Sequence, residues 1–97
     1  MPTYVTLFKW TGQGVKDIKN VPARFAASKK LIETHGGKLL GLYVTMGEYD
    51  VVAVSEGPSD EVAAALSISI AAKGNVTSTT MRAFTESEFA EILKKVS

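Results

Sequence analysis

The chain of 97 residues contains no cysteine and only one histidine. Without a thiol it can form no disulfide framework and no zinc–thiolate site, and it has no cysteine nucleophile. A lone histidine without clustered carboxylates is also a weak basis for a metal site. We therefore expect the protein to bind neither a metal nor another cofactor.

An excess of charge of one sign and a long hydrophobic run are also missing. The 11 Lys and Arg side chains nearly balance the 10 Asp and Glu side chains, which leaves a net charge of +1. Nucleic-acid-binding proteins usually carry a clustered basic excess. No apolar run approaches the roughly 18 residues of a membrane span, and the N-terminus lacks the basic and then apolar layout of a signal peptide. We expect a cytoplasmic protein that contacts neither nucleic acid nor a membrane.

What the sequence does contain is enough apolar material for one core. Hydrophobic residues make up 45% of the chain, which lies in the range of globular proteins. The length suits one domain over residues 1–97. Runs rich in alternating β-branched and aromatic residues predict strands at 3–11, 38–45, 49–56 and 76–83.

Apolar residues at spacings of three and four predict three helices between and after these strands. The first begins after Asn20 and ends at Gly36, with Arg24 on its solvent-facing side. The second begins at Ser59 or Asp60 and runs to about residue 72, and the third begins after Thr85, where a capping box is expected. The segment 11–14 contains two glycines and is interpreted as a loop, followed by a short turn at 15–19.

The order is therefore strand, helix, strand, strand, helix, strand and a terminal helix. Two strand–helix–strand units in tandem predict the α+β class and the ferredoxin-like split-βαβ fold. In this fold a four-stranded antiparallel sheet carries two helices on one face, and here a C-terminal helix is added. The second strand and the third are expected to form a hairpin.

The strands are apolar on both sides, which is unusual for a sheet covered by helices on one face only. In the first strand, for example, Tyr4 and Phe8 lie opposite Val5 and Leu7. The second helix is also apolar nearly all round, and Ile68 lies outside its main apolar face. We therefore expect a homodimer or a larger homo-oligomer that packs through the free sheet face. The alternative is that the terminal helix covers this face within one chain.

Two titratable side chains are candidates for acid–base chemistry. Asp50 lies with Glu48 beside Tyr49 at the predicted hairpin, and paired carboxylates can divide acid and base roles. Aspartate is equally at home in a turn, where its side chain accepts backbone N–H groups. Histidine is the only side-chain type whose ordinary pKa lies near neutrality, which makes His35 a candidate, but its place in the last turn of a helix is explained by the helix dipole alone.

Aromatic and polar side chains of the strands could also line a ligand pocket between the sheet and whatever covers it. A mostly apolar cavity with a few polar groups is typical of small-molecule sites. Core packing explains the aromatic residues equally well. The candidates on the strands are Trp10, Tyr4, Phe8, Thr6, Tyr43 and Arg82.

Three blocks of the sequence resemble the GYD-domain family of small bacterial and archaeal proteins. They are YVTLFKWTGQG at the start, MGEYD followed by VVAV in the middle, and GNVTSTTMRAFTESEF near the end. The family is named for the residues that are Gly47, Tyr49 and Asp50 here. The resemblance implies a ferredoxin-like domain of the dimeric α+β barrel type and assigns no catalytic residue. That these three residues define the family suggests a site or a hairpin needed for assembly.

Together these features favour a non-catalytic oligomeric module that binds a small molecule or another protein. The expected ligand-binding residues are Trp10, Tyr43, Gly47, Tyr49, Asp50 and Arg82. The alternative is a small dimeric-barrel enzyme, such as a cofactor-free monooxygenase or isomerase. In such an enzyme Asp50 or His35 would be the acid–base group.

Overall fold

A computed structural model describes all 97 residues. Its sheet is antiparallel and has the strand order β2-β3-β1-β4. The strands are β1 (Thr3–Trp10), β2 (Lys38–Val44), β3 (Val51–Glu56) and β4 (Val76–Ala83). The helices are α1 (Gly12–Lys16), α2 (Val21–Thr34), α3 (Asp60–Ala71) and α4 (Glu86–Leu93), with a short 3₁₀ helix at Ile18–Asn20.

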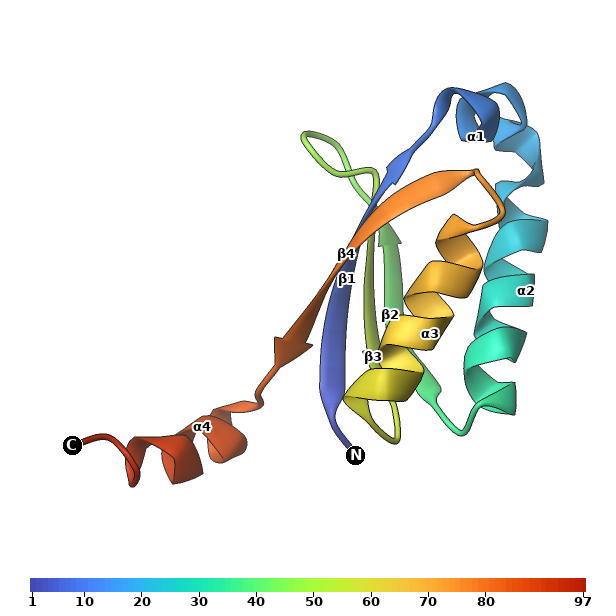
Figure 1. The fold of residues 1–97 in the computed structure, drawn as a ribbon. Coiled ribbons are helices and arrows are strands. Elements are labelled where there is room, and N and C mark those ends of the chain that lie inside the picture. The colour runs from blue at the N-terminus through green and yellow to red at the C-terminus, as the bar shows by residue number, and fades with distance from the viewer.

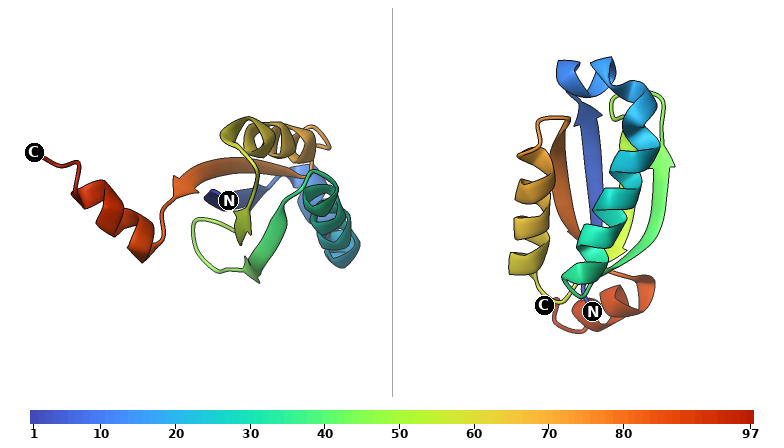
Figure 2. Two further views of the ribbon diagram at one scale, coloured as in Figure 1. Left: turned by 90° about the horizontal axis from the view of Figure 1, so that it is seen from below. Right: turned by 90° about the vertical axis from the view of Figure 1, so that its right-hand side faces the viewer.

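Helices α2 and α3 lie side by side over one face of this sheet (Figures 1 and 2). The N-terminal strand β1 runs between β3 and β4, and β2 and β3 form the expected hairpin. The ferredoxin-like α+β arrangement is thereby confirmed. None of the helices combines the length and the hydropathy that crossing a bilayer requires.

Helix α4 stands away from the rest of the molecule as an arm at the end of β4 (Figures 1 and 2). Its N-terminus has the predicted capping box, in which Thr85 and Glu88 exchange side chain-to-backbone hydrogen bonds. Because the arm extends into solvent, the radius of gyration is 14.6 Å, against about 12.5 Å for a compact chain of this length. The alternative in which the terminal helix covers the sheet face within one chain is therefore wrong.

The sheet face opposite α2 and α3, called the open face here, is correspondingly uncovered. Strand register places two rows of side chains across it. One row follows Gly41, Val54, Val5 and Met81, and the other follows Tyr43, Val52, Leu7 and Thr79. Apolar side chains dominate both rows, as the sequence predicted.

The segment 11–14, predicted to be a loop because it contains two glycines, is helical from Gly12 onward. Helix α1 begins at Gly12, and the Thr11 hydroxyl caps it by accepting the Gly14 N–H at 3.1 Å. A Cβ at Gly14 would lie 2.1 Å from the Asn75 carbonyl oxygen. Glycine is present here because the helix packs directly on the backbone that precedes β4, and not because the chain turns.

The strand β2 also differs from simple alternation. An irregularity in its pairing with β3 lies between Leu39 and Gly41. As a result, Leu39 and Leu42 both face the helices, although alternation places them on opposite sides. The strand β3 begins at Val51, so Tyr49 and Asp50 belong to the connection and not to the strand.

The chain on its own buries little of its apolar material. Only 7 of the 97 residues are buried, and no large side chain is completely enclosed. The accessible surface of 6385 Å² exceeds the about 5400 Å² expected for a compact monomer of this mass. Much apolar surface is therefore free to bind a partner or a ligand.

Candidate functional site

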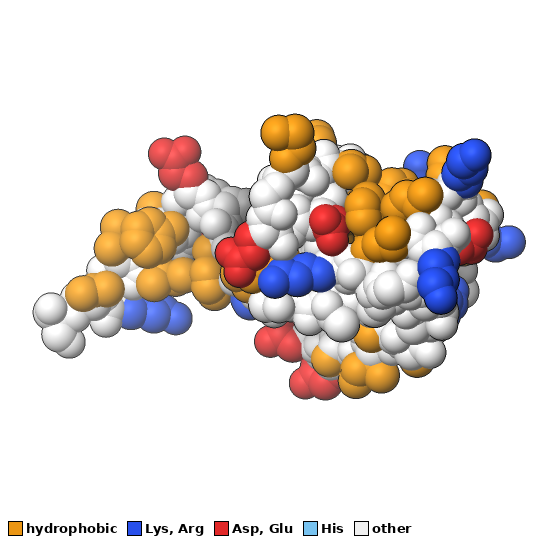
Figure 3. All heavy atoms as spheres, turned by 90° about the horizontal axis from the view of Figure 1, so that it is seen from above, with side chains coloured by type: hydrophobic (Ala, Val, Ile, Leu, Met, Phe, Trp, Pro, Cys, Tyr) orange, Lys and Arg blue, Asp and Glu red, His pale blue; other side chains and the backbone are white.

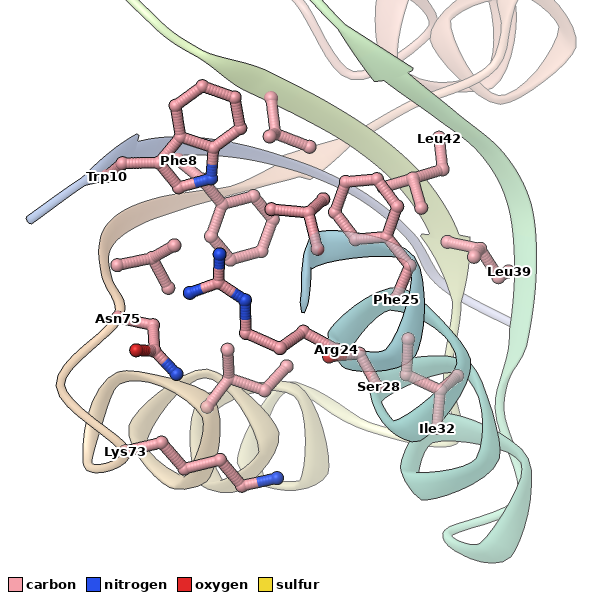
Figure 4. A pocket seen from close by; sticks show the side chains of 14 residues that line it. Phe8, Trp10, Arg24, Phe25, Ser28, Ile32, Leu39, Leu42, Lys73 and Asn75 are labelled. Carbon is pink, nitrogen blue, oxygen red and sulfur yellow. The ribbon is translucent and has the colours of Figure 1, made fainter. Parts of the chain in front are cut away.

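A cavity of about 100 Å³ lies between the sheet and helices α2 and α3. Figure 4 shows the side chains that line it. The sheet contributes Phe8 and Trp10 from β1, while Phe25 and Ile32 enter from α2. The remaining apolar lining residues are Val21, Leu39, Leu42, Val51, Ile70 and Val76.

The polar groups of the cavity are few, and no acidic side chain is among them. They are Arg24 and Ser28 from α2 and Lys73 and Asn75 from the segment between α3 and β4. An apolar cavity with a few converging polar groups is the usual form of a small-molecule site. The charged groups in this lining are both cationic.

The guanidinium of Arg24 is held inside the structure by backbone carbonyls. Its Nη2 donates to the carbonyl oxygens of Gly14 at 3.1 Å and Asp17 at 3.3 Å. Its Nη1 is buried and has no hydrogen-bond partner. In Figure 4 the Arg24 side chain extends from α2 toward the side of the cavity where Trp10 and Asn75 lie. Buried polar atoms are normally paired, so this nitrogen is an exception that calls for an acceptor.

The segment that carries Lys73 and Asn75 is fastened to the N-terminal part of the chain. The Gln13 Nε2 donates to the Lys73 carbonyl oxygen at 2.9 Å and to the Asn75 Oδ1 at 3.0 Å. The Thr11 backbone N–H donates to the Asn75 carbonyl oxygen at 3.0 Å. These contacts fix one wall of the cavity, which is the pre-organisation that a binding site needs.

A second cavity of about 50 Å³ lies between α3 and the sheet. It shares Phe8, Ile32 and Ile70 with the first, so the two are neighbours. Its polar groups include Thr80, whose hydroxyl lies 2.7 Å from that of Ser67. The space beneath the helices therefore extends along the sheet beyond the first cavity.

Of the six ligand-binding residues expected from the sequence, Trp10 lines the first cavity. Asp50 does not line the cavity, but it contacts the backbone of two residues that do. The Asp50 Oδ2 accepts the backbone N–H of Trp10 at 2.9 Å, and the Asp50 N–H donates to the Phe8 carbonyl oxygen at 2.8 Å. Asp50 thus extends the hydrogen bonding along β1 by one residue before β3 begins at Val51.

Gly47, Tyr49 and Tyr43 lie outside both cavities. Gly47 has a φ of 106°, a conformation that glycine adopts without strain. The ring of Tyr49 packs against Lys9, whose Nζ lies 5.2 Å from the ring centroid. Tyr43 is 62% exposed and belongs to the open face. The structure therefore does not gather the six residues into one pocket.

Arg82 lies near the far end of β4 among aromatic and acidic side chains. Its guanidinium lies 5.8 Å from the Tyr4 ring centroid and 4.5 Å from that of Phe84. Its ion pairs are long, 4.0 Å to Asp60 and 3.8 Å to Glu88. These contacts tie β4 to the start of α3 and to the arm, so Arg82 holds elements together at the base of α4.

The hydroxyl of Tyr4 gives this end of the sheet a measurable pH dependence. Tyr4 is 4% exposed and donates to Asp60 Oδ1 at 2.6 Å. Burial, with the hydrogen bond and the charge of Asp60, raises the pKa of Tyr4 from 10.0 to about 12. The folded state therefore favours the neutral phenol, and its contribution to stability is complete below pH 10 and lost as the pH rises toward 12.

We expect Tyr4→Phe to be less stable than the original chain below pH 10, and the difference to shrink between pH 10 and pH 12. Denaturant unfolding of both proteins across this range measures the difference. The two proteins share every other titratable group, so the comparison isolates the Tyr4 hydroxyl. A stability difference that stays constant through pH 12 would contradict the assignment.

His35 lies at the C-terminal cap of α2 and is exposed. Its Nδ1 lies 2.9 Å from the Leu31 carbonyl oxygen, which also accepts the His35 backbone N–H at 3.2 Å. It lines neither cavity. This placement agrees with the helix-end role and puts the imidazole away from the apolar space where a ligand would lie.

Arg24 is the main residue that the sequence interpretation missed. The sequence interpretation puts it on the solvent-facing side of its helix, where arginine is usually found. Its spacing of three from Val21 and four from Ser28 nevertheless puts it on the inner face. Helix geometry, rather than the charge of the side chain, therefore gives the correct face for Arg24.

Comparison with protein families gives one match. The family described as GYD domain covers residues 4–93, which is nearly the whole chain. No curated protein matches the chain significantly. The matched region includes the cavity, the hairpin connection with Gly47, Tyr49 and Asp50, and most of α4. The chain belongs to the GYD domain family.

Proposed function

We propose that the protein is a non-catalytic module that binds a small molecule between its sheet and helices α2 and α3. The observation that carries the proposal is the cavity itself. Ten of its 14 lining residues are hydrophobic, and a small set of polar groups enters it. This composition matches that of known small-molecule sites.

The titratable groups favour binding over acid–base catalysis. Asp50 and His35, the candidates for an acid–base role, do not line the cavity. The Asp50 carboxylate is engaged by the Trp10 backbone N–H. Arginine stays protonated in proteins and makes a poor general base, so Arg24 is suited to holding a ligand and not to moving a proton.

Native mass spectrometry of the protein purified from its own source tests the proposal. We expect an extra mass that disappears on denaturation. Ser28→Phe should abolish it, because the larger side chain fills the cavity. Ala27→Phe, on the exposed side of the same helix, should retain it. A mass that survives Ser28→Phe, or a chain that carries no bound molecule, would count against the proposal.

We also propose that the module is a homodimer that packs through its open faces. The accessible surface of the chain exceeds that of a compact monomer of the same mass by about 1000 Å². Each partner in a standard protein–protein interface buries about 800 Å², so the excess is of the size that a dimer buries. The arm adds a second apolar surface, formed by Phe84, Phe89, Leu93 and Val96, which are all exposed. Figure 3 shows hydrophobic side chains gathered along this arm. Two copies can cover each other's open face and arm, which one copy alone leaves in water.

We expect Met81→Glu to convert the dimer into a monomer. Met81 is 42% exposed at the edge of the open face, so a carboxylate is tolerated in one chain but would be desolvated between two. Ile68→Glu is the matched control, because Ile68 is 69% exposed on α3. This helix lies on the other side of the sheet from the open face. Light scattering after gel filtration measures both masses. If Ile68→Glu dissociates the protein and Met81→Glu does not, the interface lies on α3.

A further inference from the structure

We infer that the ligand of the cavity is a compact monocarboxylate, an apolar body with one anionic end that Arg24 binds. This inference rests on the proposed function, since it names the ligand class of the same cavity. It starts from the Arg24 Nη1, which is buried without a partner while Nη2 of the same guanidinium is paired twice.

A buried donor without an acceptor carries an unfavourable desolvation free energy, more so when the group is charged. The Gly14 and Asp17 carbonyls anchor one side of the guanidinium and fix its position. The free Nη1 is itself enclosed, so a ligand in the cavity reaches it once the neighbouring lining side chains shift slightly, while the guanidinium stays in place. A carboxylate is the acceptor that forms the strongest hydrogen bonds with a guanidinium.

The charges around the cavity favour an anion as well. Lys73 lines the same cavity, and no aspartate or glutamate does. Ten hydrophobic neighbours make a doubly charged phosphate costly to desolvate there. A single negative charge at the Arg24 guanidinium, with an apolar body against Phe8 and Phe25, satisfies both parts of the lining.

The volume limits the size of that body. The cavity measures about 100 Å³, somewhat less than the engineered cavity of about 150 Å³ that holds benzene. A short branched chain therefore fits it, whereas a ring the size of benzene needs the neighbouring space as well. The neighbouring cavity beyond Phe8 and Ile70 offers about 50 Å³ more along the sheet.

Benzoate and benzamide are suitable probes because they have nearly the same shape and differ in charge. We expect titration of the full-length protein, followed by backbone amide NMR, to show that benzoate binds about tenfold more tightly than benzamide, the ratio that one charge-assisted hydrogen bond supports. The shifts of both should centre on the amides of Phe8, Phe25 and Val76, which surround the cavity.

Arg24→Met should remove the preference for benzoate and leave benzamide binding within about twofold, since the apolar lining remains. Lys30→Met is the matched control, because it makes the same charge change on the exposed side of α2 and should keep the preference. If Arg24→Met does not fold, the comparison of the two probes on the original chain still decides the question.

The outcomes separate the two proposals. Benzamide binding as tightly as benzoate at the cavity amides would overturn the carboxylate inference and leave small-molecule binding in place. Benzoate shifts that centre on exposed lysines would also overturn it. If neither probe shifts the cavity amides at millimolar concentration, the small-molecule function itself fails, and the inference fails with it.

Discussion

Replacing Gly14 with alanine is expected to lower the free energy of unfolding by about 3 kcal/mol, at the upper end of the cost of overpacking. The added Cβ would lie 2.1 Å from the Asn75 carbonyl oxygen and 3.1 Å from its carbon. These are backbone atoms, held in place because Asn75 O also accepts the Thr11 N–H. Neither side can rotate away, so α1 or the start of β4 must shift. For a chain of this length the melting temperature should fall by about 12 °C or more.

Gly12→Ala in the same short helix is the matched control. A Cβ at Gly12 meets nothing within 4 Å, and alanine restricts the unfolded chain more than glycine does. We therefore expect this variant to be unchanged or about 0.5 kcal/mol more stable. Thermal and denaturant unfolding of both variants make the comparison. Equal effects of the two substitutions would show that α1 does not pack on Asn75.

Asp50→Ala is the second substitution with a large expected effect, a loss of about 2 kcal/mol in the free energy of unfolding. It removes the acceptor of the Trp10 N–H, which has no strand partner on that side because the pairing of β1 with β3 ends at Phe8 and Val51. Asp50→Asn keeps an acceptor oxygen and should lose less. Denaturant unfolding measures both variants.

Glu48→Ala serves as the control two residues away. Its carboxylate reaches only Lys9, at 3.9 Å and largely in solvent, so we expect a change of at most about 0.5 kcal/mol. An Asp50→Ala protein that is as stable as the Glu48→Ala protein, but has lost a turnover that the original chain shows, would support the enzyme alternative. Loss of stability supports the role of Asp50 in closing the hairpin onto β1.

The elements that the sequence predicted well are those specified by local patterns. The range 76–83 matches β4 at both ends, because a run rich in β-branched residues lies between Gly74 and the cap at Thr85. The Thr85 capping box could likewise be recognised from the spacing of two residues. Both depend on neighbours within a few positions, which a single sequence displays directly.

The errors arise where distant parts of the chain meet. Gly12 and Gly14 have low helix propensity, yet they are helical because the Thr11 cap and the close contact with Asn75 outweigh it. The direction of α4 also has no local signal, since its apolar stripe would suit either its own sheet or a second copy. The position of Arg24 was available from helix geometry, but its unpaired nitrogen depends on carbonyls that only the fold brings near.

The central position of β1 has a consequence for how the protein is made. This strand leaves the ribosome before both of its partners, because Thr3 pairs with Glu56 on one side and with Ala83 on the other. Contacts of such high sequence separation slow folding, because a long loop must close before they stabilise anything. During synthesis one edge of β1 therefore stays unpaired until β3 has emerged, and the other edge until β4 has emerged. A nascent chain stalled before residue 76 would expose an aromatic, β-branched strand, which is a target for chaperones and a starting point for aggregation.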